Sequence, residues 1–89
     1  MQRKELTRCL KAVANERRVR ILDELRHSPG LTVGGLGRIL KLSYPSISRH
    51  IQKLAACDLI ALDQRSLNVI CHLNRSHPLL RAVLPLSRS

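Results

Sequence analysis

The chain has 89 residues, which is the length of one domain and leaves room for only a limited core. It contains one Tyr and neither Phe nor Trp, so the core has to be built from Leu, Ile, Val and Ala. Sixteen Lys and Arg against six Asp and Glu give a formal net charge of +10, which favours a polyanionic partner, nucleic acid before membrane.

Neither a membrane segment nor a disulfide framework is expected. No apolar stretch is long enough to span a bilayer, and Met1 precedes Gln-Arg-Lys-Glu rather than an apolar signal core. The cysteines Cys9, Cys57 and Cys71 are odd in number and widely spaced, which fits a reducing compartment. The sequence therefore predicts a soluble, cytoplasmic protein with no membrane partner.

Two helices are predicted before the first strong break in the chain. The first has one apolar face at the spacing i, i+4, i+7, i+8, formed by Leu6, Leu10, Val13 and Ala14. Asn15 is the predicted N-cap of the second helix. The residues that this helix turns inward are Val19, Ile21, Leu22 and Leu25. Ser28-Pro29-Gly30 ends it.

A third and a fourth helix follow, separated by a tight turn. After a short extended segment over 31–33, Thr32 caps the third helix. The inward face of that helix is Val33, Leu36, Ile39 and Leu40. Lys41-Leu42 makes the turn, and Ser43 caps a fourth helix over 43–57 with Pro45 in its first turn, where a missing N–H costs nothing. The inward face of the fourth helix is Ile47, Ile51, Leu54 and Ala55.

From Leu59 the apolar period changes to two, which is typical of strands. The strand over 67–73 has an inward face formed by Leu67, Val69, Cys71 and Leu73. Residues 59–63 are its predicted antiparallel partner, with Gln64-Arg65-Ser66 between them. A short last helix over 78–84 carries Leu79, Leu80, Val83 and Leu84. The expected fold class is mainly α with a small β-hairpin, a single winged helix-turn-helix domain over 1–89.

The outward face of the fourth helix suits the major groove of DNA. On a helical wheel with Ile47 inward, the residues that point most directly outward are Pro45, Arg49, Gln52 and Ala56. Ser46 and Lys53 flank them on one side, Tyr44 and Ser48 on the other, and His50 borders the core. Arg can contact guanine and Gln adenine with two hydrogen bonds each. A solvated helix surface has the same residue types, but the capped turn and the charge of +10 favour groove binding.

Arg65 is placed at the tip of the predicted hairpin, in a wing over 63–67. An Arg on a wing commonly enters the minor groove, where narrow A·T tracts concentrate negative potential. Residues at loop tips are also often exposed and charged without any such role. Arg65 is included among the predicted DNA contacts on the first ground.

Two segments resemble the ArsR-type (arsenic-repressor) family of winged-helix repressors. Residues 10–22, LKAVANERRVRIL, resemble the opening of these proteins. Residues 43–54, SYPSISRHIQKL, resemble their recognition helix, and Leu59-Ile60 resembles the start of their wing. The resemblance covers about Leu6 to Leu73, with the two segments in the family's order and at its separation.

The resemblance implies a homodimer that binds a palindromic operator near a promoter. Its dimerisation helices would lie over 1–14 and 77–86. It also implies that an effector, usually a metal ion, releases the DNA. The matching positions implied to contact DNA are Ser43, Pro45, Ser46, Ser48, Arg49 and His50.

The chain departs from the pattern of the metal-sensing members. Its third helix, VGGLGR over 33–38, has no cysteine and a low helix propensity, and the last segment offers His77 alone. Asp58 stands where the family usually has Gly after the recognition helix. No metal site and no cofactor are predicted, and the three cysteines are interpreted as packing residues.

The sequence thus predicts a sequence-specific regulator of transcription, a dimeric repressor that binds double-stranded DNA and has no catalytic site. A metal- or redox-responsive sensor with cysteines brought together across the dimer is one alternative, which metal content would test. A winged-helix module that binds RNA or protein is another, which a comparison of duplex DNA with RNA would test. The predicted DNA-binding residues are Ser43, Tyr44, Pro45, Ser46, Ser48, Arg49, His50, Gln52, Lys53 and Arg65.

Overall fold

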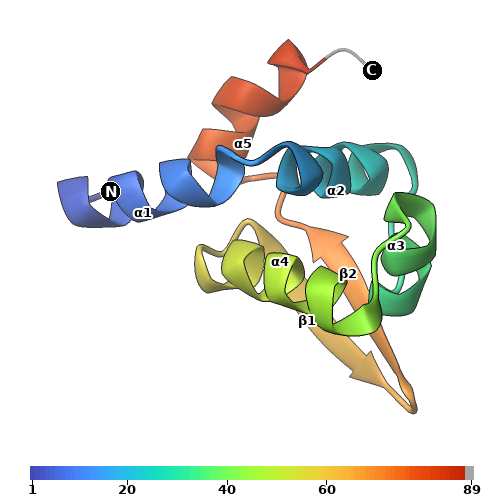
Figure 1. Ribbon diagram of the computed structural model, residues 1–89. Coiled ribbons are helices and arrows are strands. Elements are labelled where there is room, and N and C mark those ends of the chain that lie inside the picture. The colour runs from blue at the N-terminus through green and yellow to red at the C-terminus, as the bar shows by residue number, and fades with distance from the viewer. Residues whose placement is uncertain (88–89) are drawn as a thin grey trace.

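Four helices, an antiparallel hairpin and a short last helix follow one another along the chain, in the order that the sequence predicts (Figure 1). The computed structural model describes residues 1–87. The elements are α1 (Arg3–Val13), α2 (Glu16–His27), α3 (Val33–Leu40), α4 (Tyr44–Ala56), β1 (Ile60–Arg65), β2 (Asn68–Leu73), α5 (Pro78–Val83) and the 3-10 turn η1 (Leu84–Leu86). The predicted winged helix-turn-helix fold is confirmed. None of the described helices is long and apolar enough to cross a membrane.

Three helices begin at the side-chain caps that the sequence predicts. The capping side chains and the backbone N–H groups that donate to them are Asn15 with Arg18 at 3.2 Å, Thr32 with Gly35 at 2.9 Å, and Ser43 with Ser46 at 3.4 Å. Each cap satisfies a backbone donor that has no partner within the first helical turn. Side-chain chemistry at single positions therefore determines where α2, α3 and α4 start.

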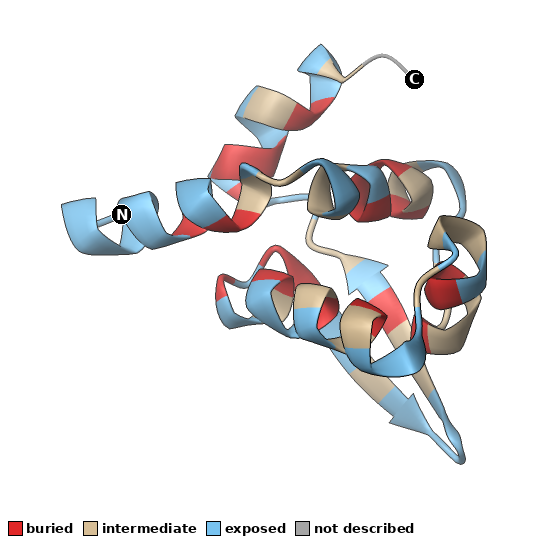
Figure 2. Ribbon diagram, in the orientation of Figure 1, coloured by how far each residue is buried: buried red, intermediate tan, exposed pale blue. Residues whose placement is uncertain are grey.

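The core is aliphatic, as the composition requires, and lies between α2, α3, α4 and the hairpin (Figure 2). Its fully buried side chains are Ile21, Leu22, Leu25, Leu36, Ile47, Ile51, Leu54 and Leu59, together with Cys9 and Cys71. Residues that were predicted to face inward but are only half-buried are Val19, Ile39, Leu40 and Ala55. They sit at the margins of the core, where the helix curves away from its neighbours.

The apolar face predicted for α1 is not the face that packs on the core. Cys9 and Ala12 are buried, whereas Leu6 and Leu10 are 37% and 43% exposed. Small side chains allow α1 to lie close to α4, and the Cys9 thiol reaches the Cys57 carbonyl oxygen, its hydrogen-bond acceptor, at 4.0 Å. α1 therefore keeps an apolar flank that its own chain does not cover.

The hairpin is longer than predicted, and this moves its tip. β1 and β2 pair in register up to Arg65 opposite Asn68, which leaves only Ser66 and Leu67 in the turn. The prediction that Arg65 occupies the tip and that Leu67 faces inward is wrong. Arg65 ends β1, and Leu67 is 96% exposed at the turn. The turn closes in two residues because Ser66 adopts a left-handed backbone with φ 57°.

The short extended segment predicted before α3 is confirmed. Thr32 forms an isolated antiparallel bridge with Ile70, and the Cys71 N–H donates to the Leu31 carbonyl oxygen at 2.9 Å. This contact explains why Ile70, predicted to face outward, is half-buried. The bridge joins the hairpin to the start of α3.

α5 packs on the core of its own chain. Leu79, Leu80 and Leu84 are buried, and the Arg26 guanidinium donates to the Leu84 carbonyl oxygen at 3.0 Å. The His77 ring caps the helix, since its Nδ1 accepts from the Leu79 N–H at 3.1 Å. With Nδ1 as acceptor, the Nε2–H donates to a second group, the carbonyl oxygen of Cys57, at 3.1 Å. His77 thus has a structural role with both ring nitrogens used.

α3 and α4 approach closely at Gly37. A Cβ atom at this position would lie 3.2 Å from Ile47 Cγ2 and 3.3 Å from the Leu42 carbonyl oxygen. A Cβ atom at Gly34 would meet only the end of the Arg38 side chain, at 3.8 Å. The two glycines therefore differ: Gly37 permits the packing of the two helices, and Gly34 only lowers helix propensity.

This difference predicts opposite effects of two alanine substitutions. Gly34→Ala should stabilise the fold by about 1 kcal/mol through helix propensity alone. Gly37→Ala gains the same propensity, but overpacking costs about 1–3 kcal/mol, so we expect a net loss. Urea denaturation of both variants measures the effect. Equal stabilisation by the two substitutions would contradict the close packing at Gly37.

Candidate nucleic-acid interface

Two residues with left-handed backbone bracket α4. Lys41 has φ 58°, and the Leu42 N–H that follows donates to the Gly37 carbonyl oxygen at 2.9 Å. This compact turn ends α3 and sets the direction of α4. Asp58 has φ 58° after the helix, the conformation for which Gly is the usual residue. The Asn74 side chain donates to the Asp58 carbonyl oxygen at 2.8 Å and helps to hold this end.

The outward face predicted for α4 is exposed in the structure. Of the predicted DNA-binding residues, those exposed on α4 and its cap are Ser43, Tyr44, Pro45, Arg49, Gln52 and Lys53, and those half-buried are Ser46, Ser48 and His50. All of them lie on one continuous stretch of chain whose opposite side is buried in the core. The hydroxyl, amide and cationic groups of α4 are thus presented together.

Arg65 lies apart from this group, near the end of the hairpin that projects from the body (Figure 1). Its Nε donates to Asp63 Oδ2 at 2.8 Å. The hydrogen bond and the charge of Asp63 raise the pKa of Arg65, which therefore stays protonated. Arg65 is exposed but already held by a carboxylate, while Leu67 occupies the tip.

His50 is held as a neutral ring beside the exposed face. The Arg18 Nε–H donates to His50 Nδ1 at 3.1 Å, so the proton of the neutral ring is on Nε2. Burial lowers the pKa of His50, and the positive charges of Arg18 and Arg17 lower it further. Arg18 also donates to the Ala12 carbonyl oxygen at 3.2 Å. One guanidinium thus joins α1, α2 and α4.

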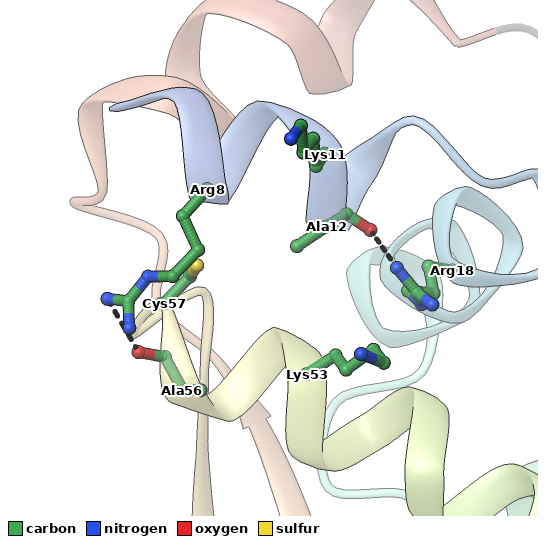
Figure 3. A pocket seen from close by; sticks show the side chains of 7 residues that line it. All are labelled: Arg8, Lys11, Ala12, Arg18, Lys53, Ala56 and Cys57. Atoms are coloured by element: carbon green, nitrogen blue, oxygen red, sulfur yellow. Dashed lines mark hydrogen bonds between the residues drawn. The ribbon is translucent and has the colours of Figure 1, made fainter. Parts of the chain in front are cut away.

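Four cations converge on a cavity that the sequence analysis did not identify. The cavity has a volume of about 310 Å³ and lies between α1, the start of α2, and α4 (Figure 3). Its lining residues are Arg8, Lys11, Ala12, Arg18, Lys53, Ala56 and Cys57. We interpreted α1 only by its apolar spacing, although basic residues also recur on it at i, i+4 and i+7, as Lys4, Arg8 and Lys11.

The cysteines have the properties of packing residues. Burial raises the pKa of Cys9 and of Cys71 to about 11, which favours the thiol over the thiolate that binds metals and reacts with oxidants. Over residues 1–87, no group of three or more His, Cys, Asp or Glu is placed to hold a metal ion. Cys9 and Cys57 are brought together by the contact of α1 with the end of α4, which their wide spacing in the sequence did not indicate.

The model of the MarR family matches residues 15–66, which span α2 to the end of the first strand. Comparison with curated protein sequences found no match. The matched region contains the tight turn, α4 and the whole of the exposed face described above.

Solved structures of transcriptional regulators are similar over nearly the whole chain. HlyU from Vibrio cholerae is 32% identical, with 97% of this chain and 92% of HlyU covered and a TM-score of 0.79. The transcriptional regulator HlyU from Vibrio vulnificus is 32% identical, with coverages of 93% and 83% and a TM-score of 0.74. The antimony-specific transcriptional repressor AntR is 25% identical, with coverages of 93% and 73% and a TM-score of 0.77.

The contact of Arg18 with His50 predicts a change in the titration of the histidine. Arg18→Gln should raise the pKa of His50, because it removes both the donor to Nδ1 and a nearby positive charge. The pKa should remain below 6.5, since burial persists. An NMR titration of the ring protons measures it, with Arg20→Gln as the control. An unchanged His50 pKa in Arg18→Gln would rule out this contact in solution.

The lowered pKa also gives the sign of the pH dependence of stability. The unfolded chain takes up the His50 proton first as the pH falls, because its pKa is the higher one. The contribution of His50 to stability is therefore complete above pH about 6.5 and is lost progressively below it.

Proposed function

The chain belongs to the MarR family of winged-helix transcriptional regulators, and from this premise we propose that it is a repressor that binds a palindromic DNA operator as a homodimer. The observation that carries the proposal is the exposed face of α4, held behind a tight turn by a buried opposite side. The net charge of +10 supports a polyanionic partner. Repression is proposed because AntR, 25% identical to this chain, is a transcriptional repressor.

Within the winged-helix regulators we assign the chain to the ArsR type. The assignment rests on residues 10–22 and 43–54, which resemble the opening and the recognition helix of that group. The family model that matches is the MarR one, so the sequence segments alone support this finer assignment. A metal response is not part of the proposal, because α3 carries no cysteine.

Arg49 and Gln52 are proposed to recognise bases. Both are exposed on the side of α4 opposite Ile47, and their side chains can make paired hydrogen bonds to guanine and to adenine. The hydroxyl groups at the start of α4 and Lys53 near its end are proposed to contact phosphates, which orient the helix in the groove. Arg65 is proposed to contact the flanking minor groove, which requires its pair with Asp63 to rearrange or to be shared.

The dimer is proposed to form through α1. Leu6 and Leu10 are partly exposed one turn apart, and Leu86 after α5 is 77% exposed. The leucines of α5 itself are covered by their own core, so α1 and the end of η1 carry the apolar surface that a second copy would bury. The two recognition helices would then meet half-sites about 10–10.5 bp, or a multiple of this, apart.

Arg49→Ala and Lys53→Ala should separate recognition of sequence from attraction to the backbone. Arg49→Ala should weaken operator binding by about 1–3 kcal/mol and relax the preference at one base position. Lys53→Ala should weaken all duplexes alike and lower the magnitude of the salt slope by about one. The operator is first obtained by selection from random duplexes, and affinities are then measured at several salt concentrations against duplex DNA and RNA.

Two results would contradict the proposed function. One is a selection that enriches no motif. The other is an Arg49→Ala variant that weakens operator and random duplex equally, since α4 would then be a general polyanion surface. Tighter binding of RNA than of duplex DNA would favour the RNA-binding alternative.

Leu10→Glu should dissociate the dimer, because it places a charge in the apolar flank of α1. Sedimentation equilibrium at tens of micromolar should show a dimer for the unmodified chain and a monomer for the variant. Leu67→Glu is the matched control, since this leucine is exposed at the hairpin turn. A monomeric unmodified chain, or a Leu10→Glu variant that stays dimeric, would remove α1 from the interface.

A further inference from the structure

The cavity between α1 and α4 has a cationic rim and an apolar floor. Arg8 and Lys11 reach it from α1, Arg18 from α2 and Lys53 from α4 (Figure 3). Ala12 and Cys57 form the buried part of its wall. Among the described residues that line it there is no Asp or Glu. The positive charges are therefore not neutralised from within the cavity, and an anion is the complementary occupant.

The cations of α1 extend beyond this cavity. Lys4, Arg8 and Lys11 follow the i, i+4, i+7 spacing and so share one flank of the helix. A second hollow, with a volume of about 330 Å³, is lined by Arg3, Lys4, Thr7, Arg8 and Lys11. The row from Lys4 to Lys11 spans about 10 Å along the helix axis. It lies on a different flank from Leu6 and Leu10, which are proposed to form the dimer.

The row is continuous with the recognition helix. The Arg8 Nη2–H donates to the Ala56 carbonyl oxygen at 3.3 Å, which fixes α1 against the end of α4. Lys53 lines the cavity from α4, one turn before that end. Arg18 lines it as well and holds His50 on the same helix. The cationic flank of α1 therefore adjoins the flank of α4 that carries predicted DNA contacts.

We propose that this row on α1, with the cavity beside it, binds consecutive phosphates of the DNA backbone next to the groove that α4 enters. The inference rests on the proposed function. A single small anion would need only the cavity, whereas the row is long enough for several charges. Duplex DNA presents a phosphate every 3.4 Å of axis on each strand, so a 10 Å row matches about three of them. The charge and length of the flank thus favour a polyanion track.

Phosphate contacts of this kind add affinity without sequence preference. Each neutralised phosphate releases condensed counterions, so each contact makes the logarithm of the binding constant fall more steeply with the logarithm of salt concentration, by about 0.9. The proposal therefore has a signature that a purely structural role of α1 would not produce.

The test compares Lys11→Gln with Arg81→Gln, an equal loss of charge from exposed α5. Lys11→Gln should lower the magnitude of the salt slope by about 0.9 on the selected operator and on a random duplex alike. Between 50 and 200 mM salt, it should lose about threefold less affinity than the unmodified chain does. Arg81→Gln should leave the slope unchanged. Equal slopes for Lys11→Gln and the unmodified chain overturn the proposal.

Arg8 needs a pair of variants, because it also holds the end of α4. Arg8→Lys keeps the charge and Arg8→Gln removes it, while both disturb the hydrogen bond to Ala56. The proposal expects the salt slope to be retained in Arg8→Lys and reduced in Arg8→Gln. If both variants lose the same slope, Arg8 acts through the position of the helix, and the phosphate contact is overturned at this residue. Thermal unfolding of each variant confirms that the fold is intact.

A small-molecule site is the competing outcome, tested with 2-naphthoate as the probe and 2-naphthylmethanol as its neutral counterpart. Saturable binding of naphthoate at one per chain, abolished by Lys11→Gln without any change in the salt slope, overturns the phosphate proposal. The proposed function is tested separately: random duplex suffices for the salt slopes, whereas selection and Arg49→Ala test sequence recognition. A slope change without an enriched motif would support the α1 contacts and contradict the sequence-specific repressor.

Discussion

The burial of one side of α4 is the constraint on which the rest of the structure depends. Ile47, Ile51 and Leu54 are almost completely buried, so the helix cannot rotate about its axis without exposing the largest part of an aliphatic core. That fixed rotation determines which side chains face outward. The close approach of α3 at Gly37 fixes the direction of the same helix. Stability and the presentation of the candidate interface are thus properties of one packing arrangement, since a loss of core contacts would also turn the exposed face.

The distribution of the few acids determines where the positive charge acts. Asp23 pairs with Arg26, Glu24 with Arg20, and Asp63 with Arg65. These pairs lie on α2 and on the hairpin, where they neutralise cations or, at Asp23 and Arg26, help to hold α5. No acid lines the cavity between α1 and α4 among the described residues. Half of the acidic residues are therefore spent on elements away from that flank, and the field of a chain with a net charge of +10 is strongest where α1 meets the recognition helix.

Local signals in the sequence predicted the helices and the tight turn because each depends on a few neighbouring residues. Asn15, Thr32 and Ser43 cap the helices that they were expected to cap, and the 3.6-residue period located the buried side of α4. Pairings over longer distances were not predictable in this way. The hairpin register depends on where two strands stop pairing, so the sequence did not place Leu67 at the turn. The contact of Cys9 with Cys57 depends on how α1 lies against α4, which neither segment determines alone.

α1 shows why composition of a helix can conceal its role. Its apolar residues were the only feature used to predict it, yet the core takes the small Cys9 and Ala12 and leaves Leu6 and Leu10 on one flank. The opposite flank carries cations that lie beside Lys53 and Arg18 of other elements. A helix that packs by small residues can come close to its neighbours and still present two chemically different flanks. If a second copy covers the leucines, it leaves the basic flank open, so that dimerisation and phosphate binding on α1 are compatible and do not compete for the same surface.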